Sequence, residues 1–370
     1  MSNIIAEQPM SGSKESFSWL TDIIESQDGS ECRIGIRSYP RINSEYSIAI
    51  HANNRNTYHN LIRSNFTDNW LIPNWFLAKY YGSIHYNCDT LNNVLDQKVG
   101  DKFLIYQDAQ HSEINNWVKQ KKKVLTFKFI SSVPKDNIFQ FDEGDDFNEV
   151  VNINFTKNNY RAAYIIPLIS GVLLNAKYST SGYDAQIDLQ FDITNNITEY
   201  NSSAVITYKN MEVVHNNEGK NESLIKKDIT TIDYETGKIT RLDKWTRAKN
   251  SRSVSFYMNG YDEINDFKRF IYRVAGRLNP FWFCDNDVAI HRFTVSGNTI
   301  LIPNNSYINL QTFKYVALFS GEDISYAEVL SVNSAKNHTT LTLDKKPVDT
   351  VWKISNLMLC RFDTDTVQIS

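Results

Sequence analysis

Alternating hydrophobic and polar positions recur along the chain and predict that most of it forms β-strands. Residues 32–40 (CRIGIRSYP) and 46–52 (YSIAIHA) alternate in this way, and residues 101–108 (DKFLIYQD) have the composition of a strand. The longest strand-like region covers residues 164–193 and contains two such stretches. A sheet of several strands is therefore expected in the first half of the chain.

The second stretch of that region shows the clearest alternation. Its apolar residues fall on one face of the expected strand: Ala185, Ile187, Leu189, Phe191 and Ile193. Asp184, Asp188 and Asp192 fall on the other face, which is typical of the solvent-facing side of a half-buried sheet.

Two segments have their apolar residues at helical spacing instead. Residues 55–66 place four of them on one helical face: Tyr58, Leu61, Ile62 and Phe66. Residues 16–26 show a similar spacing over a shorter length: Phe17, Leu20, Ile23 and Ile24. We therefore expect a helix at 55–66, a short helix at 16–26, and a turn at residues 26–31 (SQDGSE).

Residues 39–76 resemble residues 245–283, which indicates an internal repeat. Strand residues 47–50 match 253–256 at one constant offset, and the helical positions follow at the same offset: Tyr58, Leu61 and Arg63 match Ile264, Phe267 and Arg269. One inserted residue later, Trp75-Phe76 matches Trp282-Phe283. Three later segments match at growing offsets: 102–104 with 314–316, 113–114 with 328–329, and 125–127 with 341–343.

The repeat predicts an α+β fold that is mostly β. It consists of two tandem copies of a sheet-plus-helix module, each followed by a small β-barrel-like unit. The expected parts are an N-terminal arm at 1–27, a first module at 28–193, a linker or long hairpin at 194–229, and a second module at 230–370. We expect the Trp–Phe pair of each copy to fill the core where the chain leaves the helix, because tryptophan covers a large apolar area.

Composition and charge narrow the possible partners. Of the 370 residues, 41% are hydrophobic and 13% are aromatic. The net charge of −3 is unlike that of a protein that binds nucleic acid by neutralising phosphates. Lysines 119, 121, 122 and 123 fit a solvated hairpin tip better than a phosphate site. The acidic residues 141–150 lack the ligand spacing of a calcium loop. No nucleic-acid specificity is expected.

The sequence contains no recognisable catalytic or metal-binding motif. The phosphate-loop, nucleophile-elbow, zinc-protease and dinucleotide-binding patterns are all missing. The four cysteines (Cys32, Cys88, Cys284 and Cys360) and the seven histidines show no metal-ligand spacing. We therefore expect that the protein is not an enzyme and that it has no catalytic residue, no cofactor and no metal. The apolar runs are too short to span a membrane, and the first residues lack the apolar core of a secretory signal.

Two stretches resemble the tail-tip proteins of long-tailed bacteriophages. Their N-terminal pattern W…(D/S)-G-x-E-x-R-x-x-x-R-x-x-P-R is met here by Trp19, Asp28, Gly29, Glu31, Arg33, Arg37, Pro40 and Arg41. A second element of those proteins, F…R-G-R…F-W, is similar to Phe267, Gly276, Arg277, Pro280, Phe281 and Trp282. The chain departs from that element at Ala275 and at Leu278-Asn279.

The resemblance implies a structural protein of the phage tail tip or baseplate, assembled in the host cytoplasm and located in the virion tail. Such a protein would form a ring at the distal end of the tail tube and contact tube, hub, fibre or tip proteins. A trimer whose six modules mimic a hexamer and a true hexamer are both compatible with two modules per chain. Large, apolar contacts between subunits are expected in either case.

Two other classes of function stay open at this point. One is a carbohydrate- or receptor-binding protein at the tail end, with exposed Trp70, Trp75, Trp117 and Trp352 stacking on sugars. Burial of these tryptophans would argue against it. The other is an enzyme, a β-rich glycosidase or depolymerase, which needs two carboxylates facing each other across a groove.

Overall fold

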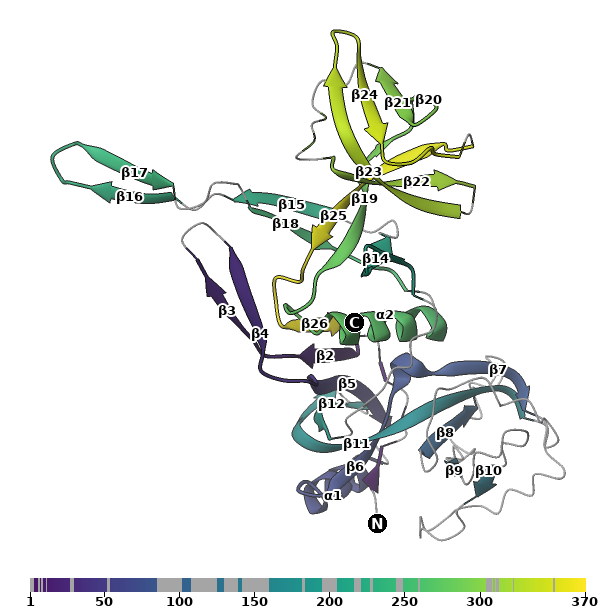
Figure 1. The fold of residues 1–370 in the computed structure, drawn as a ribbon. Coiled ribbons are helices and arrows are strands. Elements are labelled where there is room, and N and C mark those ends of the chain that lie inside the picture. The colour runs from purple at the N-terminus through teal and green to yellow at the C-terminus, as the bar shows by residue number, and fades with distance from the viewer. Residues whose placement is uncertain are drawn as a thin grey trace.

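The computed structural model describes residues 3–84, 102–107, 125–129, 139–141, 160–194, 205–215, 221–243 and 249–370, apart from short breaks within these ranges. In these residues the protein is mostly β, with few helices, as the alternation predicts. Trp117, the lysines at 119–123 and nearly all of the acidic stretch lie outside the described residues. Figure 1 shows two sheets with a helix between them and two ribbons that project to one side.

The first sheet contains eleven strands and includes both early and late residues. They are β1 (Asn3–Ile4), β2 (Lys14–Ser18), β5 (Arg41–His51), β6 (Asn69–Pro73), β7 (Lys79–Ile84), β8 (Lys102–Gln107), β9 (Leu125–Phe129), β10 (Phe139–Phe141), β11 (Tyr160–Ser181), β12 (Asp184–Ile193) and β26 (Thr366–Ile369). The main path runs β10-β9-β8-β11-β12-β5-β2-β26, and β6 and β7 also pair with β11. The last strand of the chain therefore completes a sheet that the first half builds.

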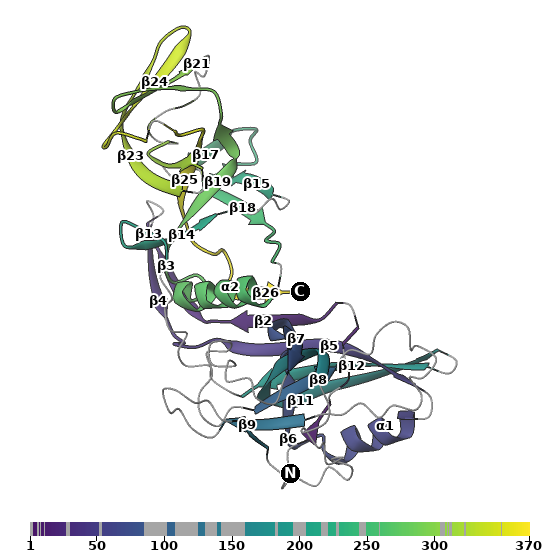
Figure 2. The same ribbon diagram turned by 90° about the vertical axis from the view of Figure 1, so that its right-hand side faces the viewer.

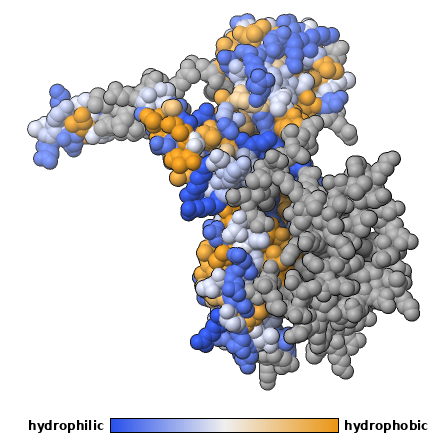
Figure 3. Space-filling model, turned by 60° about the horizontal axis from the view of Figure 1, so that its bottom comes forward, coloured by the Kyte–Doolittle hydropathy of each residue, from blue (hydrophilic) through white to orange (hydrophobic). Residues whose placement is uncertain are grey.

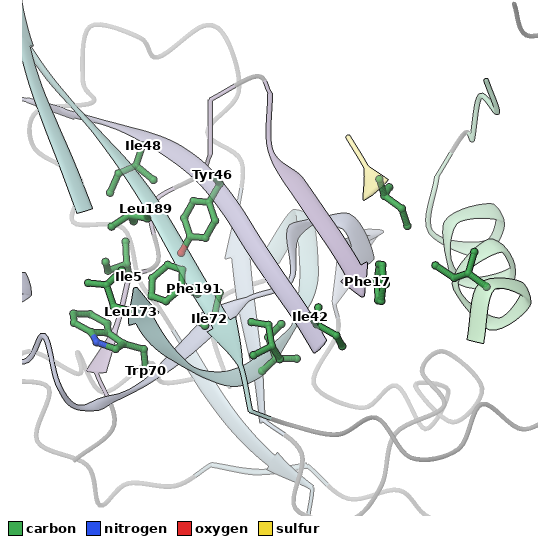
Figure 4. Packing of buried hydrophobic residues seen from close by; sticks show 14 of the residues in the cluster. Ile5, Phe17, Ile42, Tyr46, Ile48, Trp70, Ile72, Leu173, Leu189 and Phe191 are labelled. Carbon is green, nitrogen blue, oxygen red and sulfur yellow. The ribbon is translucent and has the colours of Figure 1, made fainter. Parts of the chain in front are cut away.

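Three of the predicted strand regions, 46–52, 101–108 and 164–193, lie in this sheet as β5, as β8, and as β11 with β12. β12 pairs with β5 over its whole length, and the five apolar residues assigned to one face of β12 are all buried. Figure 4 shows Trp70, Leu189 and Phe191 pointing toward a common centre with Ile48. The Phe191 ring lies 5.8 Å from Tyr46 and 6.4 Å from Trp70, measured between ring centroids.

The second sheet contains nine strands. In spatial order they are β13 (Thr207–Tyr208), β14 (Met211–His215), β19 (Phe281–Ile290), β25 (Lys353–Cys360), β22 (Tyr315–Ser320), β23 (Asp323–Ser334), β24 (His338–Leu343), β21 (Thr299–Pro303) and β20 (Thr294–Ser296). The order runs from β13 to β20 without the two ends pairing, so no closed barrel forms among the described strands. β13 and β14 come from the stretch expected as a linker or hairpin.

Three pairs of strands form ribbons outside these sheets. β3 (Thr21–Glu25) and β4 (Glu31–Gly35) form a ribbon called here the hairpin. β15 (Asn221–Lys226) pairs with β18 (Lys249–Val254), and β16 (Ile229–Asp233) pairs with β17 (Ile239–Asp243). The last two ribbons follow one another in space, and together (residues 221–254) they are called here the arm (Figure 1).

The expected short helix at 16–26 is wrong, because these residues belong to β2 and β3. In β2 the buried residues alternate, with Glu15 and Phe17 inward, and Trp19 continues the same alternation. β2 pairs with β5 on one side and with β26 on the other. Pairing with a strand from the far end of the chain overrides the helical spacing of the apolar residues.

The structure contains two α-helices in its described part, each placed just before a strand. α1 (Arg55–Ser64) confirms the predicted helix and precedes β6. α2 (Tyr261–Val274) precedes β19. Trp75 does not lie in a strand but in the 3-10 turn η2 (Trp75–Leu77) that follows β6.

α2 lies between the two sheets, as both Figure 1 and Figure 2 show. Its Phe270, Ile271 and Val274 are buried in the same core as Phe17 and Trp19 of the first half. The Tyr272 ring lies 5.9 Å from both the Phe17 and the Trp19 rings. A single hydrophobic core therefore connects the two halves through this helix.

The strands after the two helices have similar neighbours. β6 pairs in parallel with β1 and antiparallel with β11, whereas β19 pairs in parallel with β14 and antiparallel with β25. A buried tryptophan lies near the start of each strand, Trp70 in β6 and Trp282 in β19. Trp70, not Trp75, is therefore the residue whose place corresponds to that of Trp282.

Candidate assembly site

Residues of the two sequence motifs meet at one junction, where the base of the hairpin, the end of α2 and the segment before β26 come together. The carboxylate of Asp365 accepts hydrogen bonds from the backbone N–H of Thr21 (2.7 Å), the hydroxyl of Thr21 (2.8 Å) and the backbone N–H of Arg277 (3.1 Å). The backbone carbonyl of Asp365 accepts the N–H of Trp19 at 2.9 Å. One residue near the C-terminus thus holds together three segments that are far apart in sequence.

Gly276 is required at this junction by both its conformation and its surroundings. Its φ of +64° is in the left-handed region that favours glycine. A Cβ atom there would lie 2.9 Å from a carboxylate oxygen of Asp365 and 3.2 Å from the Cβ of Trp19. The glycine of the second motif therefore allows the end of α2 to approach the tryptophan of the first motif.

Arg33 holds one face of the hairpin against the end of α2. Its guanidinium donates to the carbonyl of Arg277 at 2.6 Å and to the carboxylate of Glu31 at 2.9 Å. Gly35 on the same strand is so close to Leu278 that an added Cβ would lie 2.8 Å from a methyl group of that leucine. These contacts fix the direction in which the hairpin projects.

The opposite face of the hairpin is apolar and exposed. Cross-strand pairs place Asp22 opposite Ile34 and Ile24 opposite Cys32, so these four residues share one face. Ile24 is 55% exposed and Ile34 is 49% exposed. Leu20 and Ile36, at the base of the hairpin, are exposed as well. A soluble chain rarely leaves such a face uncovered without a partner for it.

The arm also exposes large apolar side chains. They are Leu224, Ile225, Ile232, Tyr234 and Ile239. Figure 3 shows the arm projecting from the body, with orange apolar patches between blue polar ones. A two-stranded ribbon of this kind has little stability of its own in water, because it has no sheet or helix to cover its faces.

A buried ion pair fixes α2 to the first sheet. Lys268 of α2 contacts Glu15 of β2, and both side chains are almost completely buried. The ammonium group also lies over the rings of Phe17 (5.6 Å) and Phe76 (5.7 Å). Because an unpaired charge is costly in such surroundings, this pair favours a single fixed arrangement of the two halves.

The second sheet contains a polar cluster, formed by His215, Tyr326 and Cys284, that belongs to its buried interior. His215 shares a 3.0 Å hydrogen bond with the hydroxyl of Tyr326, and burial lowers the pKa of His215. Burial raises the pKa of the Cys284 thiol to about 11. A protonated thiol is a poor nucleophile and a poor metal ligand. Among the described residues, no three His, Cys, Asp or Glu side chains are grouped to hold a metal ion.

The tryptophans proposed for sugar binding occupy different environments. Trp70 is buried, and its indole N–H donates to the carbonyl of Asn65 at 3.1 Å. Trp75 is half-buried, Trp352 is 51% exposed, and Trp117 is outside the described residues. Trp70 and Trp75 therefore pack the structure, and only Trp352 presents an open ring among those described.

Sequence reasoning missed the residue at the centre of the junction. Asp365 lies in a short polar segment (DTDT, 363–366) that belongs to neither motif. Nothing in its neighbours indicates that it binds backbone groups more than 300 positions away, as it does at Thr21. The helical spacing in residues 16–26 also hides the uncovered face of the hairpin, because it predicts a helix where β3 forms.

Comparison of the sequence with protein families and with curated proteins identifies no relative. No protein-family model matches the chain. No curated protein sequence matches it significantly. Neither helix in the described part of the chain is long and apolar enough to cross a membrane.

Proposed function

We propose that this protein is a structural component of a bacteriophage tail tip or baseplate. In this role it forms a ring at the distal end of the tail tube and connects the tube to the tip or fibre proteins. The observation that carries the proposal is the junction around Asp365, where residues of both tail-tip motifs position a projecting hairpin with an uncovered apolar face. Such a face is suited to contact with another subunit or tail protein.

The proposal includes a tandem duplication of one module. The similar pairing of β6 and β19, each after a helix and each starting near a buried tryptophan, supports it. β8 pairs antiparallel with β11, as β22 does with β25, at the segments that the sequence repeat matches. Two modules per chain would let three copies present six similar surfaces to a six-fold tail tube, and six copies would serve the same tube directly.

Light scattering of the purified protein after size exclusion, together with negative-stain images, tests the ring. We expect a mass of three or six chains of 42.8 kDa and ring-shaped particles. Labelling of phage particles with an antibody against the protein should mark the tail tip. A monomer at all concentrations, together with no labelling of tails, would overturn the proposal.

One observation favours a second candidate, a receptor- or carbohydrate-binding role at the same end of the tail. The exposed Trp352 ring lies 6.1 Å from the exposed His291 ring, beside Lys353. Aromatic rings next to polar side chains suit the stacking of sugars. Binding to a glycan array that is lost in Trp352→Ala, with the oligomer unchanged, would support this role.

A further inference from the structure

We propose that the arm of one copy packs face to face on the hairpin of a second copy, and that this contact joins neighbouring copies. This inference deepens the proposed function, since it names the surfaces through which a ring would form. It rests on that function only in requiring that copies associate.

The hairpin face carries a single charged side chain among its described residues. Asp22 lies on this face with Ile24, Cys32 and Ile34, and all four are exposed. The other charged residues of the two strands, among them Glu25 and Arg33, are on the opposite face. The exposed face is therefore apolar with one negative charge.

The matching face of the arm carries one charge of opposite sign. In the ribbon of β16 and β17, Ile232 lies opposite Thr240, and Tyr234 pairs with Lys238 at the end of the ribbon. Ile232, Tyr234 and Lys238 are exposed. Lys238 is the charged residue on this side among those with described side chains. The face is therefore apolar with one positive charge.

The two faces also agree in size. β3 and β4 contain five residues each, and so do β16 and β17. Two ribbons of equal length and width can cover each other completely when they pack as two layers about 10 Å apart. Ile232 and Tyr234 would then contact Ile24 and Ile34, and Lys238 could pair with Asp22.

A second copy is the occupant that these observations favour. The chain carries both complementary faces, and both are uncovered. A contact from the arm of one copy to the hairpin of the next covers both faces at once, and such head-to-tail contacts form a ring when the rotation between copies closes. A different partner on either face would leave the other one exposed. An arm that folds onto the hairpin of its own chain is the alternative, and the test below separates the two.

The first test compares two isoleucines of the same ribbon that differ only in the face they occupy. Ile232 lies on the proposed contact face, whereas Ile239 pairs with Asp233 on the opposite face. Both are exposed, so Ile232→Ser and Ile239→Ser should both fold. We expect Ile232→Ser to raise the protein concentration needed for half-assembly about tenfold or more, as expected for loss of a buried apolar contact, and Ile239→Ser to leave it unchanged. Equal effects of the two substitutions would overturn the proposal.

The second test exchanges the two charges. Asp22→Lys and Lys238→Asp should each weaken assembly about tenfold, because each places two like charges in contact. The double variant should regain the assembly of the natural protein. Loss of assembly that the double variant does not restore would show that the two residues do not meet.

The third test distinguishes contact between copies from contact within one chain. A cysteine introduced by Thr240→Cys should be linked to the native Cys32 by a bis-maleimide that spans the separation of about 10 Å between packed layers. Cys88→Ser and Cys360→Ser remove competing thiols. Thr231→Cys, on the opposite face of the arm, serves as the control. A ladder of linked chains that is specific to Thr240→Cys supports the proposal, and linkage confined to single chains overturns it.

These outcomes also separate failure of the inference from failure of the proposed function. A natural protein that forms rings while Ile232→Ser and the charge exchange leave them intact would overturn the inference and keep the function. A natural protein that never associates would overturn both.

Discussion

The two helices occupy similar places before β6 and β19, yet they are buried in different ways. At positions matched by the sequence repeat, α1 carries Ile62 and α2 carries Lys268. Both side chains are buried, with 2% and 1% of their surface exposed. Ile62 packs into the core beside its own sheet, whereas Lys268 meets Glu15 of the other half. The comparison shows that a buried residue of the helix before a strand packs within one half in α1 and joins the two halves in α2.

The largest expected effect comes from breaking this ion pair on one side. Lys268→Met leaves Glu15 buried without its partner, which should lower the free energy of unfolding by about 3–5 kcal/mol. Urea unfolding followed by tryptophan fluorescence measures the change. The double variant Lys268→Met with Glu15→Leu should recover most of the loss, because an apolar pair can replace a buried ion pair. A double variant as unstable as the single one would show that α2 needs the charges themselves.

The matching change in α1 should cost less. Ile62→Ala removes buried methyl groups and leaves a cavity, which should lower the free energy of unfolding by about 2–3 kcal/mol. α1 lies at the edge of the core and contributes one fully buried residue, so its surroundings can partly collapse. Asn60→Ala, at an exposed position of the same helix, is the control and should change little. An Ile62→Ala variant less stable than Lys268→Met would contradict the ranking of the two helices.

The ends of the two helices differ as well, and Asp365 tests this difference. α1 ends on Asn65, whose side chain donates to the carbonyl of Leu61 within the same helix at 2.8 Å. The last turn of α2 is also closed locally, since the side chain of Asn279 donates to the carbonyl of Arg273 at 2.9 Å, but the segment just after the helix is held in addition by Asp365, which accepts the N–H of Arg277. Asp365→Ala should lower the free energy of unfolding by about 1–3 kcal/mol through loss of charge-assisted hydrogen bonds.

Asp365→Ala should also loosen the hairpin, so limited proteolysis within residues 20–36 should become faster. Asp363→Ala is a matched control, since Asp363 is exposed two residues earlier. A hairpin that resists the protease equally in both variants would show that Arg33 alone is enough to hold it.

The smallest effect concerns the short strands that lie beside β6 and β19. β14, which lies beside β19, carries His215, whereas β1, which lies beside β6, consists of Asn3 and Ile4 and carries no histidine. Burial, and then the nearby charge of Lys353, lower the pKa of His215 below its ordinary value of 6.5. The unfolded chain therefore binds a proton at a higher pH than the folded protein does. The stability that neutral His215 contributes is present above about pH 6.5 and is lost as the pH falls through the lower pKa of the folded state.

The check for this effect is the pH dependence of unfolding in His215→Phe. Between pH 7 and pH 5 the natural protein should lose more stability than the variant does, by about 1 kcal/mol or less. The same slope in both proteins would mean that other groups dominate the titration.

Elements with a strong local pattern could be predicted from the sequence. The strict alternation in residues 184–193 identifies β12 and its buried face, and the helical spacing in residues 55–66 identifies α1. Both patterns follow from local geometry, since the period of side chains along a strand or helix is fixed. Neither prediction required knowledge of which strands lie next to β12 or α1 in space.

Elements that depend on distant partners could not be predicted in this way. The local spacing in residues 16–26 predicts a helix where β2 forms, because the pairing of β2 with β26 leaves no sign in the local sequence. The sequence repeat matched Trp75 with Trp282 by residue type, whereas the strand neighbours match Trp70 with Trp282. The motif residues were found from their resemblance, but Asp365, which brings them together, gives no local pattern to find.

The pairing of β2 with β26 also has a consequence for the order of folding. Contacts between residues so far apart in sequence form slowly, because a long loop must close first. Ribbons and neighbouring strands can form while the chain is still being made. The hydrogen bonds from Thr21 and Arg277 to Asp365 can form only after Asp365 has left the ribosome. The hairpin can therefore take up its final direction only after residue 365 has been made and has reached the junction, later than its own two strands can pair.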